Sequence, residues 1–374
     1  MIVDKLGTPA FLRDYWQKQP VLLRQAIPDF VDPVSPEQLA GLACETEVES
    51  RLVFTRRQTW QMQSGPFRTR DFTALPARNW TLLVQAVDQW LPEVKQLLAT
   101  VPFLPTWRVD DVMISYATPN GGVGPHFDYY DVFLVQGQGS RIWKTGQHCT
   151  SADTLRTGSG LKLLKHFHTE HEWHLQSGDV LYVPPGIAHW GVSVDNSLCY
   201  SIGFRAPSMA EAVLGYSEEL AAGLSPDLRF RDPKRQQPLR AGEISAADLL
   251  QAKRQLQQVL HDDAALQRWF GMHMTQPRYP ELIQPEQCRL RPQARLGLHP
   301  ASRLAWLEHA HQLQVFVDGD SQLLPASNRL RKALQQLSRG ESVSYKSLAS
   351  NNAGRHWCQQ LLAHGSLQAE QSDD

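Results

Sequence analysis

The spacing of hydrophobic and polar residues changes twice along the chain, near residues 109 and 207. Between these positions, short β-rich runs are separated by glycine and proline. The runs are VMISYAT, DVFLVQG, SRIWKTG, GDVLYVPPG, HWGVSV and LCYSIGF. Strands at such regular spacing are typical of a closed barrel or a sandwich. We therefore expect a mainly β core over about residues 109–207, with helical additions on both sides.

The pattern before the β core is mixed. Residues 8–17 and 79–100 carry apolar residues at helical spacing, and residues 20–24 resemble a short strand. After the core, residues 209–224 and 246–260 have apolar residues every three or four positions, and each stretch follows a serine that can cap a helix. A helical segment therefore follows the β core.

The last part of the chain predicts a small α/β domain. Residues 304–325 form two apolar runs around Asp318-Gly319, which is a typical hairpin turn. Helical patterns follow over residues 327–337 and 354–363. We expect three domains, comprising residues 1–207, 208–285 and 286–374.

Composition limits the protein classes that fit. The 37 Lys and Arg balance 38 Asp and Glu, so direct RNA binding through an overall basic field is not expected, and contact with a ribonucleoprotein would have to be local. The five cysteines form no CxxC pair, which favours free thiols in a reducing compartment. No apolar run has the length of a signal peptide or a membrane span. We therefore expect a cytoplasmic protein without a membrane anchor.

The strongest chemical signal lies in GGVGPHFDYYDVFLVQG. In extended backbone, positions i and i+2 share a face, so His126 and Asp128 can direct an imidazole and a carboxylate at one ion. A third ligand is available in GDVLYVPPGIAHWGVSV, where His189 opens a strand 189 − 126 = 63 positions later. Two histidines and one carboxylate on one face leave open positions, which suits a catalytic Fe(II) site better than a closed structural zinc site.

Two further features of the β core bear on this site. Arg141, in GSRIWK, is a candidate to bind a carboxylate through its planar guanidinium, although a surface arginine on an edge strand is the alternative. The HFHTEHEWH stretch, with His166, His168, His171 and His174, is a candidate second metal site, but a polar strand leading to Gly178 fits its spacing better.

The blocks PNGGVGPHFDYYDVFLVQGQGSRIWK, GDVLYVPPGIAHWG and YSIGFRAP resemble the Jumonji C family of Fe(II)- and 2-oxoglutarate-dependent oxygenases, in particular its bacterial ribosomal-oxygenase branch. The order of modules is similar as well. It implies a double-stranded β-helix (cupin or Jumonji C barrel) in residues 1–207, a helical dimerisation segment in 208–285 and a winged-helix-like domain in 286–374. The resemblance covers nearly the whole chain, although its specific motifs lie between residues 109 and 207.

This resemblance also implies roles for individual residues. It assigns the iron ligands to His126, Asp128 and His189, the basic cosubstrate residue to Arg141, and a position beside the cosubstrate to Ser115. The implied cosubstrates are 2-oxoglutarate and dioxygen. The implied substrate is the β-carbon of an arginine in a large-subunit ribosomal protein, and the implied assembly is a homodimer.

The sequence departs from the family at one position and leaves alternatives open. Trp190 stands where a close relative has glutamate, so the rim of the pocket is expected to differ. Asp110 and Asp111 are candidate acceptors for a substrate guanidinium, but acids at the start of a strand are commonly structural. Three other functions stay open: hydroxylation or demethylation of another protein residue, a non-catalytic metal-binding cupin, and a ribosome- or RNA-binding protein with a vestigial barrel.

Overall fold

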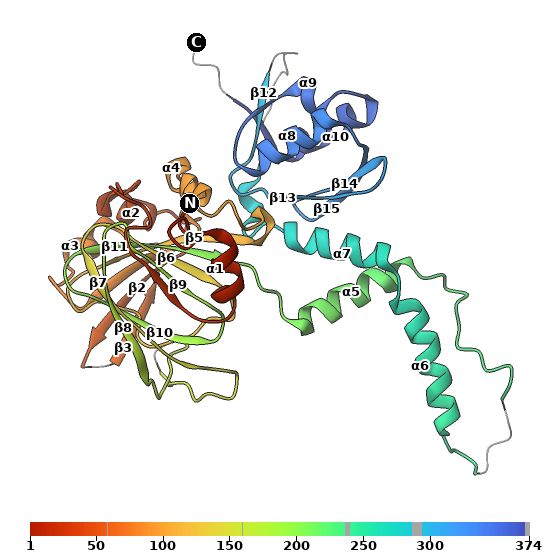
Figure 1. The fold of residues 1–374 in the computed structure, drawn as a ribbon, viewed down its shortest axis with the longest axis horizontal. Coiled ribbons are helices and arrows are strands. Elements are labelled where there is room, and N and C mark those ends of the chain that lie inside the picture. The colour runs from red at the N-terminus through yellow and green to blue at the C-terminus, as the bar shows by residue number, and fades with distance from the viewer. Residues whose placement is uncertain (58, 159, 236–239, 286–293, 371–374) are drawn as a thin grey trace. The chain divides into compact units, whose positions relative to one another are not determined.

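The computed structural model describes residues 1–374 except 58, 159, 236–239, 286–293 and 371–374 (Figure 1). It divides into two compact units. The first comprises Met1–Ala206 and Arg339–Glu341, and the second comprises Pro207–Ser338 and Ser342–Asp374. The predicted boundary between residues 285 and 286 adjoins a stretch outside the described residues, and it stays a prediction.

Two antiparallel sheets form the β core of the first unit. The larger has the strand order β1-β9-β6-β11-β5-β4-β2-β3, and the smaller has the order β10-β7-β8. The strands of the larger sheet are β1 (Val21–Leu23), β2 (Ser50–Arg56), β3 (Thr59–Ser64), β4 (Trp80–Val84), β5 (Val109–Ala117), β6 (Val132–Gln136), β9 (Val180–Val183) and β11 (Ser197–Phe204). Those of the smaller are β7 (Ser140–His148), β8 (Thr169–Gln176) and β10 (Ile187–Ser193).

The central strands of the larger sheet are covered on both faces. One face packs on the N-terminal segment, where the Phe11 ring lies 5.6 Å from Phe133 and 5.1 Å from Tyr182. The other face lines the interior between the sheets, where Leu134 packs in one cluster with Trp143 of the smaller sheet. Burial on both faces explains why β6, β9 and β11 are apolar at nearly every position rather than at alternate ones. The predicted β core is confirmed.

The N-terminal part matches the prediction only in places. The expected helix and strand appear as α1 (Thr8–Asp14) and β1, but residues 79–100 are not one helix. They begin with β4, which is buried along its whole length, and continue as η1 (Val87–Gln89), α4 (Pro92–Lys95) and η2 (Gln96–Thr100). The hairpin of β2 and β3, which extends the larger sheet, was not predicted. The remaining elements here are α2 (Pro36–Leu42), α3 (Thr69–Thr73) and η3 (Thr106–Arg108).

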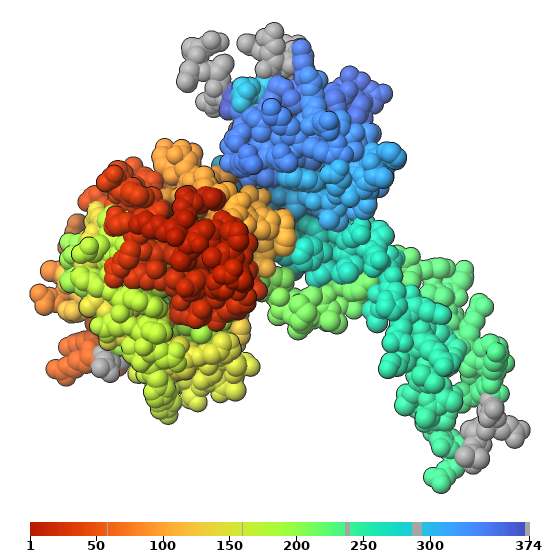
Figure 2. Space-filling view, viewed as in Figure 1, coloured from red at the N-terminus to blue at the C-terminus, as the bar shows by residue number. Residues whose placement is uncertain are grey.

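The second unit opens with the two expected helices. In α5 (Met209–Gly223) and α6 (Ala246–Leu260), the capping serines Ser208 and Ser245 accept hydrogen bonds from backbone amides of the first turn, as predicted. A third helix, α7 (Asp263–Thr275), packs against α5. Figures 1 and 2 show α6 extending away from α5 and α7. None of the helices in the described residues is long and apolar enough to cross a lipid bilayer.

In its described residues, the C-terminal part of this unit contains two small sheets, three α-helices and one short 3-10 helix. The strand pair around Asp318-Gly319 is part of a three-stranded meander, and both turn residues have positive φ, at 51° and 88°. This part has one buried core of its own, which includes Leu313, Leu334 and Trp357. Its elements are η4 (Pro280–Leu282), β12 (Arg295–Leu298), β13 (Leu304–Glu308), β14 (Gln312–Val317), β15 (Asp320–Pro325), α8 (Asn328–Ser338), β16 (Val343–Ser344), α9 (Tyr345–Leu348), α10 (Asn352–His364) and β17 (Leu367–Ala369).

Candidate active site

Main-chain hydrogen bonds bring the three predicted metal ligands together. His126 precedes β6 and pairs with His189 of β10 as an isolated antiparallel bridge. The amide of His126 donates to the His189 carbonyl at 3.1 Å, and the amide of His189 donates back at 2.8 Å. The carbonyl of Asp128 accepts from the amide of Gly186 at 2.7 Å. The backbone therefore holds the ligand segments in place independently of their side chains.

Each imidazole is oriented by a carbonyl two residues earlier in the chain. Nδ1 of His126 lies 2.9 Å from the Gly124 carbonyl oxygen, and Nδ1 of His189 lies 3.0 Å from that of Ile187. Because a carbonyl can only accept, each Nδ1 carries the proton and donates it. In the neutral imidazole this arrangement leaves the lone pair on Nε2, which is the form that a histidine ligand needs.

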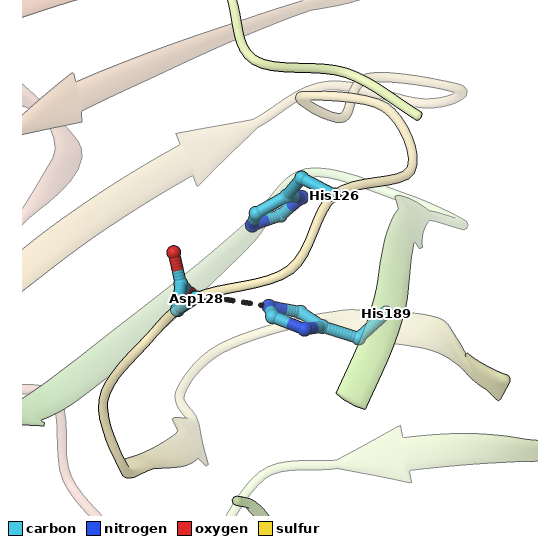
Figure 3. Close-up of side chains that lie close together, drawn as sticks. All are labelled: His126, Asp128 and His189. Carbon is cyan, nitrogen blue, oxygen red and sulfur yellow. Dashed lines mark ion pairs between the residues drawn. The ribbon is translucent and has the colours of Figure 1, made fainter. Parts of the chain in front are cut away.

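The three side chains point toward one another (Figure 3). Nε2 of His189 lies 3.6 Å from Oδ2 of Asp128, and the two imidazole centroids are 4.3 Å apart. One ligand atom from each residue lies within 4.8 Å of the other two. Atoms bound about 2.1 Å from a common ion lie about 3–4 Å apart, so the set fits one transition metal ion. Two histidines and a carboxylate on one side of the ion suit non-haem Fe(II).

Burial keeps one of the imidazoles neutral. Removal from solvent and the neighbouring His126 lower the pKa of His189 to about 4, although Asp128 opposes this shift. A histidine must be deprotonated at the ligating nitrogen to bind a metal. His189 therefore meets this requirement at neutral pH without losing a proton on binding.

Arg141 lies inside the core and not on an edge of the sheet. It starts from β7 and reaches the larger sheet, where Nε donates to Oγ of Ser197 at 2.8 Å and Nη1 donates to Oγ of Ser115 at 2.8 Å. Nη2 donates to the carbonyl oxygens of the same two serines at 2.8 and 3.0 Å. The alternative of a surface arginine is wrong, because Arg141 is only 5% exposed.

The charge of Arg141 is not neutralised by the protein residues described. Its four hydrogen bonds go to hydroxyl and carbonyl oxygens, and none of them goes to a carboxylate of the described residues. Burial lowers the pKa of Arg141, yet a guanidinium stays protonated in proteins. A buried cation without a counter-ion favours the binding of an anion.

The other sequence candidates lie elsewhere or already have partners. Residues 169–174 of the HFHTEHEWH stretch lie in the polar strand β8, and His166 and His168 precede it. Among the described residues only His126, Asp128 and His189 bring three metal-ligating atoms together. Asp111 accepts from Nε2 of Gln85 and the amide of Ala86, and Asp110 pairs with Arg205 at 3.2 Å. Both acids thus have structural partners.

Trp190 faces away from the metal ligands, because it follows His189 on the same strand. Its ring lies 6.1 Å from that of Trp60 and 6.2 Å from that of Phe167, both nearly perpendicular to it. The ammonium of Lys144 lies 5.8 Å from its centroid. Trp190 therefore packs against aromatic side chains and Lys144 and contributes no atom to the metal site.

One contact of the site was not predicted from the sequence. Ser197 provides two of the four hydrogen bonds to Arg141. It opens β11 after a turn and belongs to no motif, so no local signal distinguishes it from any other serine at the start of a strand. Only the pairing of β11 with β5 places Ser197 near Ser115.

Comparison with known proteins assigns the fold to a family. The JmjC domain family matches residues 96–212, and a ROXA-like winged helix matches residues 258–368, beginning within α6. An AraC-like ligand binding domain matches residues 164–270, a range that crosses the boundary between the two units.

Similar proteins cover most of the chain. The ribosomal protein uL16 3-hydroxylase of Escherichia coli K12 is 36% identical over 77% of this chain and 76% of its own. A probable ribosomal oxygenase of Haemophilus influenzae is 34% identical over 74% and 71%. The crystal structure of E. coli YcfD has a TM-score of 0.86 with 30% identity over 98% of both chains.

A second structure of E. coli YcfD, a ribosomal oxygenase, contains cobalt and 2-oxoglutarate and has nearly the same similarity to this chain. It has a TM-score of 0.84 and covers 98% of this chain and 99% of its own, at 30% identity. Fold, module order and sequence identity thus agree with one another. The chain belongs to the JmjC-domain oxygenases, in the branch of the bacterial ribosomal oxygenases.

Proposed function

We propose that the protein is an Fe(II)- and 2-oxoglutarate-dependent hydroxylase that acts on the β-carbon of an arginine in ribosomal protein uL16. The observation that carries this proposal is the combination of two features in one β core. Three metal-ligating side chains converge on one point, and a buried arginine without a carboxylate partner lies on the strand next to one of them. A structural metal site would not need the second feature.

In this proposal His126, Asp128 and His189 hold Fe(II). When bound, the iron supplies the oxidising chemistry: dioxygen and 2-oxoglutarate are converted to succinate and carbon dioxide, and one oxygen atom enters the substrate C–H bond. The protein residues bind, orient and exclude water. The Nδ1–H groups of the histidines stay hydrogen-bonded to the carbonyl oxygens of Gly124 and Ile187, so the ligands keep one orientation throughout turnover.

Arg141 binds the carboxylate of 2-oxoglutarate that is remote from the iron. Its four hydrogen bonds use four of the five guanidinium N–H groups and fix the plane of the group. The fifth N–H group, on Nη1, and the positive charge of the guanidinium are available to an anion. Ser115 contributes by accepting from Nη1, so its hydroxyl orients Arg141 beside the cosubstrate.

The substrate is inferred from relatives and from the exposed surface beside the ligands. The E. coli relative is named for 3-hydroxylation of uL16, and position 3 of an amino acid is its β-carbon. Tyr129 and Tyr130, which follow Asp128, are 61% and 42% exposed and can pack against a protein segment that enters the site. Net charge gives no reason to expect direct RNA binding.

We further propose that the protein is a homodimer that uses α5, α6 and α7. These helices carry many large apolar side chains that are at least 40% exposed in the single chain, whereas surfaces of monomeric proteins rarely expose such residues together. They are Met209, Val213, Leu214, Leu249, Leu250, Leu256, Leu260, Leu266 and Phe270. In α6, successive leucines at Leu249, Leu256 and Leu260 are seven and four residues apart, so their side chains lie on one face of the helix.

A cytoplasmic location follows from the proposed substrate, since ribosomal proteins are made and assembled there in bacteria. The four described cysteines, Cys44, Cys149, Cys199 and Cys358, are all free thiols, in agreement with a reducing compartment.

The test uses uL16 prepared from cells that lack this gene. Purified protein, Fe(II), ascorbate, 2-oxoglutarate and air should add the mass of one oxygen atom to a single arginine of uL16, located by fragmentation mass spectrometry. His126→Ala should add none. Succinate production without any change in uL16 would support the oxygenase and reject this substrate, and loss of a methyl group would identify a demethylase.

A further inference from the structure

β7 places three polar side chains in a row on the wall of the barrel interior. Arg141, Trp143 and Thr145 alternate along the strand, share one face and are each at most 6% exposed. Nε1 of Trp143 and Oγ1 of Thr145 are buried without a hydrogen-bond partner among the residues described. Buried donors without partners are rare because each one is costly, so two on the same wall indicate a ligand that accepts hydrogen bonds.

Both groups lie beside the metal ligands. Thr145 is the direct partner of His189 in the ladder between β7 and β10, and paired residues of such a ladder point to the same face. Trp143 pairs with Gly191 of β10. A Cβ at position 191 would lie 2.8 Å from the indole ring, so the indole can lie across β10 only because residue 191 is glycine. The Trp143 ring centroid is 6.0 Å from that of His189.

The chemistry of the wall selects an anion with oxygen atoms at both ends. An indole N–H and a guanidinium can only donate, and a threonine hydroxyl donates one hydrogen bond. An amine or a cation would therefore find almost no acceptor along this strand. The row runs from Arg141 to Thr145 at the level of His189, so a dicarboxylate can engage both ends of it.

We propose that Trp143 and Thr145 donate hydrogen bonds to the 2-oxo acid end of 2-oxoglutarate, while Arg141 binds the other carboxylate. This inference rests on the proposed function. Thr145 and Trp143 are then binding residues that select a 2-oxo acid and fix its orientation, and their lack of partners in the free protein is a stability cost that ligand binding removes.

Calorimetric titration of 2-oxoglutarate into Co(II)-loaded protein tests the proposal without turnover. Thr145→Val removes the hydroxyl at nearly constant shape, and Trp143→Phe removes the indole N–H. Each should raise the Kd for 2-oxoglutarate about tenfold, the factor that corresponds to one hydrogen bond to a charged group. Thr145→Ser keeps the hydroxyl and should stay within about threefold of wild type by the same reasoning.

A matched control is available in Thr81, whose hydroxyl is equally buried and without a partner but lies on β4 of the larger sheet. Thr81→Val should leave the Kd unchanged. In metal-free, ligand-free protein, Thr145→Val should unfold at the same temperature as wild type or higher, since it replaces an unpaired hydroxyl by a methyl group. Weaker binding together with undiminished stability is the combination that a purely structural role would not produce.

The outcomes separate this inference from the proposed function. If wild-type Co(II)-loaded protein does not bind 2-oxoglutarate at all, the proposed function fails. If wild type binds and both Thr145→Val and Trp143→Phe bind equally well, the proposed function stands and this inference is overturned. If Thr145→Ser is as weak as Thr145→Val, the size of the side chain and not its hydroxyl matters, which also overturns the role of Thr145.

Discussion

His126 and His189 are 189 − 126 = 63 positions apart in the chain, yet each donates its backbone amide to the carbonyl oxygen of the other. These two hydrogen bonds do not involve the imidazoles. Replacing either side chain should therefore remove a ligand and leave the local backbone as it is. The site can be dissected by mutation without unfolding the barrel.

We expect His126→Ala to lose Co(II) binding and succinate production. The melting temperature should stay within about 3 °C of wild type, since the side chain removed is only partly buried and the backbone pairing is kept. Calorimetric titration of Co(II), a succinate assay and thermal unfolding measure the three properties. His168→Ala, an exposed histidine before β8, is the control and should change none of them. Turnover by His126→Ala at the wild-type rate would reject the ligand assignment.

Arg141→Lys should raise the KM for 2-oxoglutarate at least about tenfold and lower kcat much less, because lysine keeps the charge but loses the planar set of donors. Ser115→Ala should give a smaller increase, since Arg141 keeps its three other hydrogen bonds to Ser115 and Ser197. Steady-state kinetics with varied 2-oxoglutarate distinguish the two. An unchanged KM in Arg141→Lys would show that the guanidinium is structural.

Gly191→Ala should destabilise the first unit by about 1–3 kcal/mol, the usual cost of forcing atoms into a packed interior. The added methyl group would lie 2.8 Å from ring carbons of Trp143, which is buried and cannot move freely. Urea unfolding measures the change in free energy. Gly297→Ala, in β12, is the matched control, because a Cβ there meets nothing within 4 Å. Equal effects of the two substitutions would contradict this account of the contact.

The double variant Leu249→Asp, Leu256→Asp should be monomeric, with a dimer Kd raised at least about hundredfold, since two large apolar side chains at the centre of an interface commonly contribute this much. Sedimentation velocity over a range of concentrations measures the assembly. Leu323→Asp replaces another exposed leucine, which lies on β15 outside these helices, and should leave the dimer intact. A wild-type protein that sediments as a monomer at every concentration would end the dimer proposal.

The sequence predicted best those features that depend on near neighbours. The spacing of His126 and Asp128, the turn at Asp318-Gly319 and the capping serines of α5 and α6 each act within a few residues, and the structure has all of them. Among contacts between distant segments, the sequence predicted that His189 lies beside His126 and Asp128, but it did not predict the contact of Ser197 with Arg141. Ser197 and Arg141 lie in different sheets, so their contact depends on how the two sheets face each other and has no local signal in the sequence.

The error at residues 79–100 has a physical cause. The five residues WTLLV of β4 are all buried, so they carry no alternation that would distinguish a strand from a helix. Ala86 then takes a left-handed conformation, with φ of 51°, which separates β4 from the helical turns that follow. Pattern alone cannot locate such a break, because alanine is ordinarily a good helix former.

Chelation should remove the metal without unfolding the protein. The ligand segments are held by backbone hydrogen bonds and the barrel has its own apolar core, unlike small domains that fold only around their ion. We expect EDTA to abolish succinate production and to leave the circular dichroism spectrum unchanged. Addition of Fe(II) should restore succinate production. Loss of the folded spectrum on chelation would contradict this.

The hydrogen bond from the Gly186 amide to the Asp128 carbonyl has a further consequence. Gly186 lies three residues before His189, and Asp128 lies two residues after His126, so this bond and the pairing of the histidines close a small ring of main chain that joins the three ligand residues. A displacement of any one ligand must then carry the other two with it. Mutations that change the preference for one metal over another are therefore expected to replace the ligand atoms themselves. Substitutions far from the site are expected to shift His126, Asp128 and His189 together.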